Sequence, residues 1–167
     1  KPVLYYYFQN KEAIYLELIR RPFSQFDALL DSVRTEEGSA TKRIFSLLDR
    51  VFSLFQDNLE AARLMYSIYY GPPQGAPFFD FDTHHVKLQE TIRHLVHEGI
   101  KQGELCQGDP ENMMWAILGA LSVTIEVQLC HPEMAIDRKR LRQILTLIFE
   151  GISNKTNQTR GSHETRD

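Results

Sequence analysis

Residues 1–11 read KPVLYYYFQNK, a stretch in which four consecutive aromatic side chains precede a short polar segment that ends in lysine. Residues of an α-helix advance by about 100° each, so three adjacent tyrosines cannot all be buried on one face. If Leu4 and Phe8 point inward as an i,i+4 pair, Tyr6 lies almost opposite them. The stretch therefore predicts a short helix that is held by two apolar side chains and presents phenol rings to a partner.

The composition is that of an ordinary globular chain. Hydrophobic residues make up 43% and charged residues 25% of its 167 residues, enough for one domain, or for one domain with the remnant of another. The net charge of −3 means that any contact with phosphates must come from a local patch. The two cysteines, Cys106 and Cys130, lack CxxC spacing, which argues for a reducing compartment and against a disulfide scaffold or zinc site.

The longest apolar run, Met113–Cys130, contains Glu126 and Gln128. A carboxylate is costly inside a bilayer, so we expect no membrane span and a cytoplasmic protein.

Apolar residues recur at a helical period along the chain, with no strand pattern and no internal repeat, so the expected fold class is all-α. The expected helices cover residues 11–33, 40–56, 58–70, 83–102, 111–130 and 137–152. Pro22 is expected to kink or restart the first of them.

Capping residues set most of these boundaries. Asn10, Asn58 and Asp137 are candidate N-caps, and Asp109 followed by Pro110 is a strong helix start. Gly71 and Gly103 are candidate helix stops.

Two stretches resemble the TetR family of bacterial transcriptional regulators. Residues 4–14, LYYYFQNKEAI, match the family pattern L-Y-x-x-F-x-x-K-E-x-L, in which the recognition helix of a helix-turn-helix ends and the next long helix begins. Residues 97–105, HEGIKQGEL, followed by Asp109-Pro110, are similar to E-G-I-x-x-G-E-L…D-P, which closes one helix and opens the next. The order and number of the expected helices also agree.

The resemblance implies a TetR-like helical bundle with three parts. Residues 1–10 are expected to be the end of the recognition helix, residues 11–152 a ligand-binding and dimerisation domain, and residues 153–167 a disordered polar tail. The family's first two helices, its turn and the start of its recognition helix are absent from this sequence. We therefore expect DNA reading to belong to a longer parent protein.

The resemblance also assigns the DNA contacts. Lys1 and Pro2 would enter the major groove, while Tyr5, Tyr6 and Tyr7 would meet phosphates and sugars of the operator. Lys11 would contact the backbone from the first turn of the next helix, where an ammonium group suits phosphate oxygens. The alternative is that the tyrosines pack within the fold.

Family members bind small molecules inside the bundle formed by the middle helices, and this sequence is rich in aromatic residues there. The candidate ligand-binding residues are Phe26, Tyr66, Tyr69, Tyr70, Phe81, Trp115 and Glu126. The tyrosines carry a polar group that can orient a ligand, although ordinary core packing remains an alternative for each aromatic residue. Glu126, inside the apolar run Val123–Val127, should be exposed, paired across a dimer, or available to a cationic ligand.

The last two expected helices carry more apolar positions than one small core needs, which is typical of a homodimer interface. The candidate interface residues are Leu118, Gly119, Ser122, Val123, Ile144, Leu145, Ile148, Phe149 and Ile152. Trp115 lies in the same pattern. Gly119 and Ser122 would allow close approach of a partner helix.

Neither a metal site nor an active site is expected. His84, His85, His94 and His97 complete no known ligand pattern, and a solvated helix face explains them better. No cofactor motif is present, and no nucleophile, base and orienting group are assembled.

The sequence thus predicts a ligand-responsive repressor that is released from its operator by a small hydrophobic or cationic molecule. The alternative is an all-α ligand-binding or protein-interaction module without DNA-binding function. An enzyme is the third and least favoured alternative.

Overall fold

The computed structural model describes residues 11–71 and 78–152, which form an all-α bundle without strands, as predicted. Its helices are α2 (Lys11–Thr35), α3 (Ala40–Asp57), α4 (Leu59–Tyr69), α5 (Phe81–Lys101), α6 (Pro110–Cys130) and α7 (Arg138–Ile152), with a short 3-10 helix η1 (Pro132–Met134). The predicted recognition-helix end at residues 1–10, the Asn10 cap and the polar tail at residues 153–167 lie outside the described residues.

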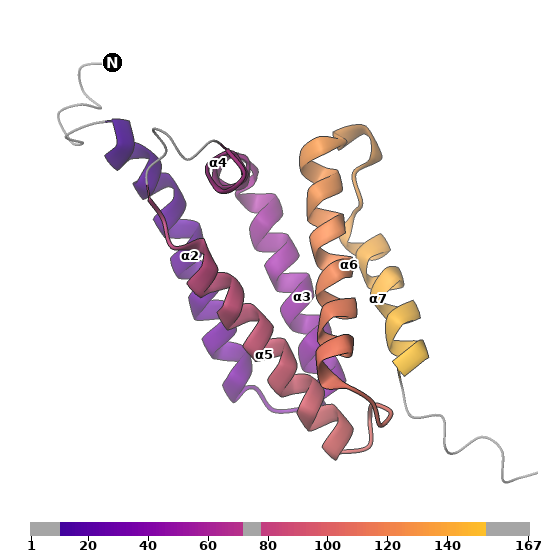
Figure 1. Ribbon diagram of the computed structural model, residues 1–167. Coiled ribbons are helices and arrows are strands. Elements are labelled where there is room, and N and C mark those ends of the chain that lie inside the picture. Colours follow the sequence, from indigo (N-terminus) through magenta and orange to yellow (C-terminus); the bar gives the residue numbers. More distant parts are fainter. Residues whose placement is uncertain (1–10, 72–77, 153–167) are drawn as a thin grey trace, which may run out of the picture.

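Helix α3 is the centre of the bundle (Figure 1). It packs against α2, α4, α5, α6 and α7, while α6 and α7 form a pair on the side away from α2. Helix α4 crosses one end of the bundle. The side chains of α3 that face the core are almost completely buried: Ile44, Leu47, Leu48 and Phe52.

Helix α2 runs through Pro22 as one helix, so of the two predicted alternatives, a kink or a restart, the restart is wrong. Proline lacks an N–H and cannot complete one internal hydrogen bond, but the buried contacts of Ile19 before it and Leu30 after it hold the helix in one piece.

The turn between α5 and α6 closes the end of the bundle opposite α4. Gly99 is buried against Leu105, and a Cβ atom at this position would lie 2.9 Å from the Leu105 Cδ1 atom. Gly103 ends α5 with a φ of 74°, which glycine adopts at little cost. In the EGIKQGEL stretch, Gly99 is thus explained by its close contact with Leu105 and Gly103 by its left-handed backbone conformation.

Glu104 from the same turn caps a helix that is distant in sequence. Its two carboxylate oxygens accept hydrogen bonds from the backbone N–H groups of Ala40, at 3.2 Å, and Thr41, at 2.9 Å, in the first turn of α3. Ser39 accepts a third bond, from the N–H of Lys42. A negative charge at a helix N-terminus is also favoured by the helix dipole.

Replacing Glu104 by alanine is expected to lower the free energy of unfolding by about 1–2 kcal/mol, because two N–H groups of α3 lose their acceptor. Chemical denaturation followed by circular dichroism measures the change. The matched control is Glu37→Ala, since Glu37 is an exposed residue of the α2–α3 loop. Equal stability of the two variants would show that the cap contributes nothing.

Two predicted helix boundaries need correction. Helix α5 begins at Phe81, two residues earlier than expected, because Asp80 is the N-cap and accepts hydrogen bonds from both the N–H and the hydroxyl of Thr83. Asn58 does precede α4, but its side-chain amide donates to the Leu54 carbonyl at the end of α3 and so caps the earlier helix. The predicted cap Asp109 is confirmed: its carboxylate accepts from the N–H of Glu111. Asp137 is confirmed likewise and accepts from the N–H of Arg140.

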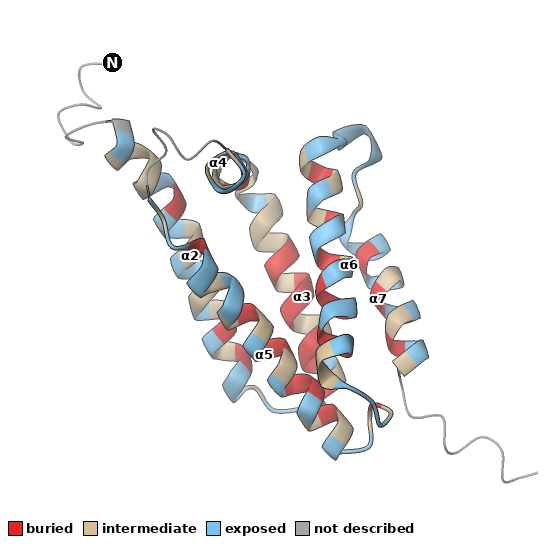
Figure 2. Ribbon diagram, viewed as in Figure 1, coloured by how far each residue is buried: buried red, intermediate tan, exposed pale blue. Residues whose placement is uncertain are grey.

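Helix α6 is apolar around its whole circumference but is buried on one side only (Figure 2). Met114, Ile117 and Leu121 lie in the core, while Trp115 and Val123 are 53% and 58% exposed. Within the part of the chain that the structure describes, α6 is the one helix whose length and composition would allow it to cross a membrane, and 33% of its most apolar window is buried inside the protein. An apolar helix with one uncovered face indicates a surface that is covered by something else.

Candidate ligand-binding site

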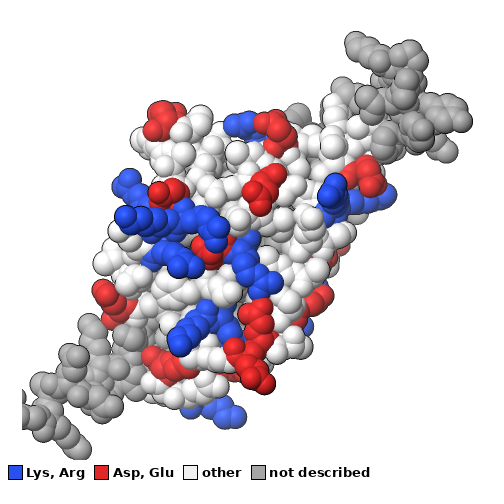
Figure 3. Space-filling view, turned by 180° about the vertical axis from the view of Figure 1, so that it is seen from behind, with Lys and Arg blue, Asp and Glu red and all other residues white. Residues whose placement is uncertain are grey.

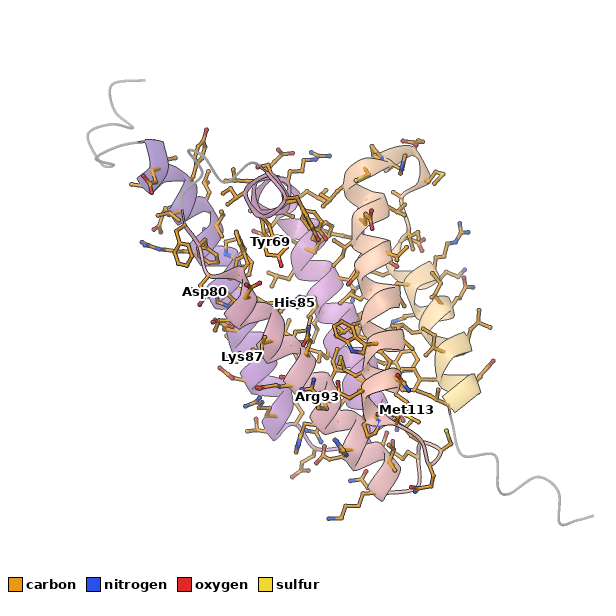
Figure 4. The ribbon with its side chains drawn as sticks, in the orientation of Figure 1. Tyr69, Asp80, His85, Lys87, Arg93 and Met113 are labelled. Carbon is orange, nitrogen blue, oxygen red and sulfur yellow. The ribbon has the colours of Figure 1, made fainter. Side chains whose placement is uncertain are left out.

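A cavity of about 680 Å³ lies below α4, between α2, α3, α5 and α6. Figure 4 shows Tyr69 on α4 and His85 on α5, two of the residues that line it. Its walls are mainly aliphatic and aromatic, with Ile19, Pro22, Phe23 and Phe26 from α2 and Val51, Leu54 and Phe55 from α3. This size and lining suit a small organic ligand.

Tyrosines of α4 form one wall of the cavity. The rings of Tyr66 and Tyr70 are 5.5 Å apart, and the Tyr69 ring meets Tyr70 edge-on at 4.9 Å. The Tyr69 hydroxyl donates to Asp82 at the start of α5. Tyr69 and Tyr70 are 52% and 74% exposed, so this wall stands at the mouth of the cavity.

A second aromatic group joins α2 to the start of α5. The Phe23 ring lies 5.0 Å from Phe79, 5.6 Å from Phe81 and 4.6 Å from the His84 imidazole. The Nδ1 atom of His84 lies 3.1 Å from an Asp27 carboxylate oxygen. This group fixes α2 against α5 beside the cavity.

Lys87 secures the same contact from its outer side. Its ammonium group lies 3.0 Å from a carboxylate oxygen of Asp31 and 3.7 Å from one of Asp27. The Lys87 charge is therefore directed to α2 and away from the cavity (Figure 4).

Most of the predicted ligand-binding residues are brought together by the fold. Phe26, Tyr66, Tyr69, Tyr70, Phe81 and Glu126 all line the cavity. Trp115 does not; it lies on the exposed side of α6, so the structure contradicts its assignment to the pocket. Trp115 lies on the face opposite the buried residues of α6, and a helix that is apolar all round gives no sequence signal for which face is covered.

Several lining residues were not among the predicted ligand contacts. They include Pro22, Phe23, His84, His85 and Cys130. Phe23 lies one turn before Phe26, so an i,i+3 pattern could have found it. His84 and His85 could not have been found without knowing that α5 begins at Phe81.

Burial raises the pKa of the Tyr66 phenol to about 12, with further contributions from Tyr70, Glu126 and Cys130. An unfolded tyrosine titrates near about 10, so the folded state holds the proton of Tyr66 at higher pH than the unfolded state does. Stability linked to this group is therefore complete below about pH 10 and is lost as the pH rises from about 10 to 12.

We expect the Tyr66→Phe variant to lose less stability than the parent over this range. Phenolate absorbance, recorded with circular dichroism, measures both the titration and the unfolding. An identical alkaline loss in both proteins would contradict the assignment.

The predicted dimer interface is only partly on the surface. Leu118, Leu145 and Phe149 are 3%, 1% and 5% exposed inside the chain, so their assignment to an interface is wrong. Ser122 is exposed but lines the cavity. Gly119 and Val123 are exposed on the outer side of α6, and Ile144, Ile148 and Ile152 are half-buried on α7.

Leu147 of α7 was not predicted to face outward, although it is 70% exposed. It lies beside Arg142, Gln143 and Thr146 around a shallow hollow near Asp49. We call the remaining residues, Trp115, Gly119, Val123, Ile144 and Ile148, the outer apolar face of α6 and α7.

The basic segment at the start of α7 contacts α3. Arg138 and Arg142 form ion pairs with the buried Asp49, and the hydrogen bond from Arg138 holds the Asp49 pKa below its usual value. Figure 3, which views the molecule from behind, shows basic side chains gathered beside acidic ones on this face. Arg138 and Arg142 thus bind the start of α7 to α3.

Among the described residues, no group of three or more His, Cys, Asp or Glu side chains is arranged to hold a metal ion.

No protein-family model and no curated protein matches the sequence. Solved structures do match. One is named "Clostridium perfringens putative fatty acid metabolism regulator"; it has a TM-score of 0.65 at 21% identity, over 89% of this chain and 80% of that one. A protein of unknown function from Rhodococcus sp. RHA1 has a TM-score of 0.65 at 17% identity, over 87% of this chain and 75% of that one. A transcriptional regulator of the TetR/AcrR family from Thermobifida fusca has a TM-score of 0.58 at 26% identity, over 90% of this chain and 79% of that one.

These similarities confirm the predicted fold. The described helices are arranged as in structures of TetR/AcrR-family regulators, and the resemblance read from the two sequence stretches agrees with this result.

Proposed function

We propose that the chain is the ligand-binding and dimerisation part of a DNA-binding transcriptional repressor, which leaves its operator when a small hydrophobic or cationic molecule occupies the cavity. The observation that carries the proposal is the position of α2. The middle of this helix lines the cavity through Ile19, Pro22, Phe23 and Phe26, and its first residue directly follows the predicted end of the recognition helix.

The outer apolar face of α6 and α7 supports a homodimer. A two-fold dimer through this face would hold two recognition helices at a fixed separation, and two half-sites of an operator lie about 34–36 Å apart. The predicted contacts of Lys1, Pro2, Tyr5, Tyr6, Tyr7 and Lys11 with DNA belong to this arrangement. A regulator of this kind works in the cytoplasm, where the DNA is.

Release from DNA follows from a shift between two conformers. A ligand that binds more tightly to the conformer with the wrong separation of recognition helices lowers the affinity for the operator by at most the ratio of its two binding constants. Because α2 is both a wall of the cavity and the connection to the reading segment, it is the element that carries the change.

The test is a mobility-shift titration of the full-length protein with the DNA upstream of its own gene, at two salt concentrations and with or without ligand. We expect salt-dependent binding that a ligand of the cavity reverses. Absence of binding at low salt would overturn the proposal and would favour a ligand-binding module without DNA function.

A further inference from the structure

The cavity has an apolar end and a polar rim. Its inner wall consists of residues that are at most 8% exposed, among them Ile19, Val51, Leu88, Leu118 and Leu121. Its exposed lining residues include Tyr70, His85, Ser122 and Glu126. A molecule with one apolar and one polar end would therefore enter with the apolar end first.

Glu126 is the one lining residue, among those that the structure describes, that carries a fixed charge. Within the described residues, its carboxylate forms no ion pair and no hydrogen bond. It follows Ile125 of the cavity wall and lies one helical turn from both Ser122 and Cys130, which also line the cavity. The carboxylate thus faces the rim without a basic partner from the described chain.

The tyrosine wall lies near this carboxylate. Tyr66, Glu126 and Cys130 line the same cavity, and the negative charge of Glu126 contributes to the raised pKa of Tyr66. The faces of Tyr66 and Tyr70 are suited to a cation, because an aromatic ring carries negative charge density on its face. An aromatic wall beside a free carboxylate is a pair of groups that both favour positive charge.

Two histidines line the cavity, of which His85 lies exposed at the rim and His84 is engaged with α2. The imidazole of His84 is directed to Asp27, and Lys87 pairs with Asp27 and Asp31. No lysine or arginine is among the lining residues of the described chain. A carboxylate ligand at the rim would therefore meet Glu126 with no lysine or arginine to offset its charge.

We propose that the cavity binds a lipophilic organic cation, an amine or quaternary ammonium compound whose charge lies between Glu126 and the rings of Tyr66 and Tyr70. Its apolar part fills the space between Val51, Leu88 and Leu121. This inference rests on the proposed ligand-binding role of the cavity and assigns the class of ligand.

The test compares three ligands with ten-carbon chains: decyltrimethylammonium and decanoate below their micellar concentrations, and decanol below its solubility limit. Isothermal titration calorimetry of the full-length protein, without DNA, measures their affinities. We expect the cation to bind about tenfold more tightly than the alcohol, because it gains one ring contact and one partly exposed charge pair. We expect the carboxylate to bind most weakly.

A matched pair of variants identifies the group responsible. Glu126→Gln keeps the size of the side chain and is expected to lower the affinity for the cation by about fivefold to tenfold while leaving decanol unchanged. Glu133→Gln makes the same change of net charge in η1, outside the lining of the cavity, and is expected to leave all three affinities unchanged. Circular dichroism and sedimentation of each variant show whether fold and oligomeric state are preserved.

Four results would contradict the proposed ligand class. Equal affinities for the three ligands, tightest binding of decanoate, no binding of the cation, or an effect of Glu126→Gln on dimer mass alone would overturn it. The binding measurement uses no DNA, so a failed mobility shift would overturn the regulatory role and leave the ligand class standing. Failure of cation binding with intact DNA binding would do the reverse.

Discussion

Replacing Glu98 by alanine is expected to lower the free energy of unfolding by about 3 kcal/mol, because it leaves a buried guanidinium group without its counterion. The Arg43 side chain is 9% exposed and its Nη1 atom lies 2.7 Å from a Glu98 carboxylate oxygen, while Nη2 donates to the Val33 carbonyl. The pair joins the start of α3 to the end of α5. Glu98 itself is 31% exposed, which places the expected loss at the lower end for buried pairs.

The control for Glu98→Ala is Glu90→Ala, an exposed position on the same helix with the same change of residue type. The double variant Arg43→Met with Glu98→Ala separates the buried charge from lost packing. We expect the double variant to be more stable than Glu98→Ala alone, since no charge is left buried. Denaturant titration measures these variants together with Arg43→Met alone, and additive losses from the two single substitutions would contradict the explanation.

Gly119→Arg is expected to convert the protein from dimer to monomer without unfolding it. A Cβ atom at Gly119 would have no other atom within 4 Å, so a longer side chain has room within one chain. The proposed two-fold axis passes through this outer apolar face, where an arginine from each copy would bring two like charges into a desolvated contact. We expect dimer affinity to fall by more than about a hundredfold and operator affinity to fall with it.

Sedimentation equilibrium measures this change directly, as a loss of half the mass relative to the unmodified protein. Gly119→Ala is the matched control, because it adds a small side chain without charge and favours the helix. A monomeric unmodified protein, or a Gly119→Arg variant that remains dimeric, would show that the interface lies elsewhere. If the Gly119→Arg monomer also has a lower thermal stability, the substitution acts on folding and not on assembly.

The predictions from sequence succeeded where a residue acts within its own helix. The caps Asp109 and Asp137 and the helical phase of the aromatic residues depend on neighbours a few positions away, so the pattern alone was sufficient. The prediction failed where the answer depends on which side of a helix is covered. Helix α6 is apolar all round, so its sequence does not distinguish Leu118 in the core from Trp115 on the surface.

Long-range partners were equally out of reach. Nothing in the sequence near Glu104 indicates that it caps α3, and nothing near Arg138 and Arg142 indicates that they pair with Asp49. Such contacts depend on how the helices are arranged in space, and the pattern within one helix carries no information about them.

The polar contacts are distributed unevenly along the bundle. Three polar contacts stabilise the end away from α4. Glu104 caps the N-terminus of α3, Arg43 pairs with Glu98, and Arg93 pairs with Glu111. Helix α2 meets this end through its last residues and is 25 residues long, or roughly 37 Å at about 1.5 Å per residue. If that end acts as a pivot, a rotation of only about 5° moves the first residue of α2 by about 3 Å, close to one base-pair step of DNA. In the proposed regulator, a small change of angle at the cavity would thus become a displacement of the first residue of α2 as long as a base-pair step.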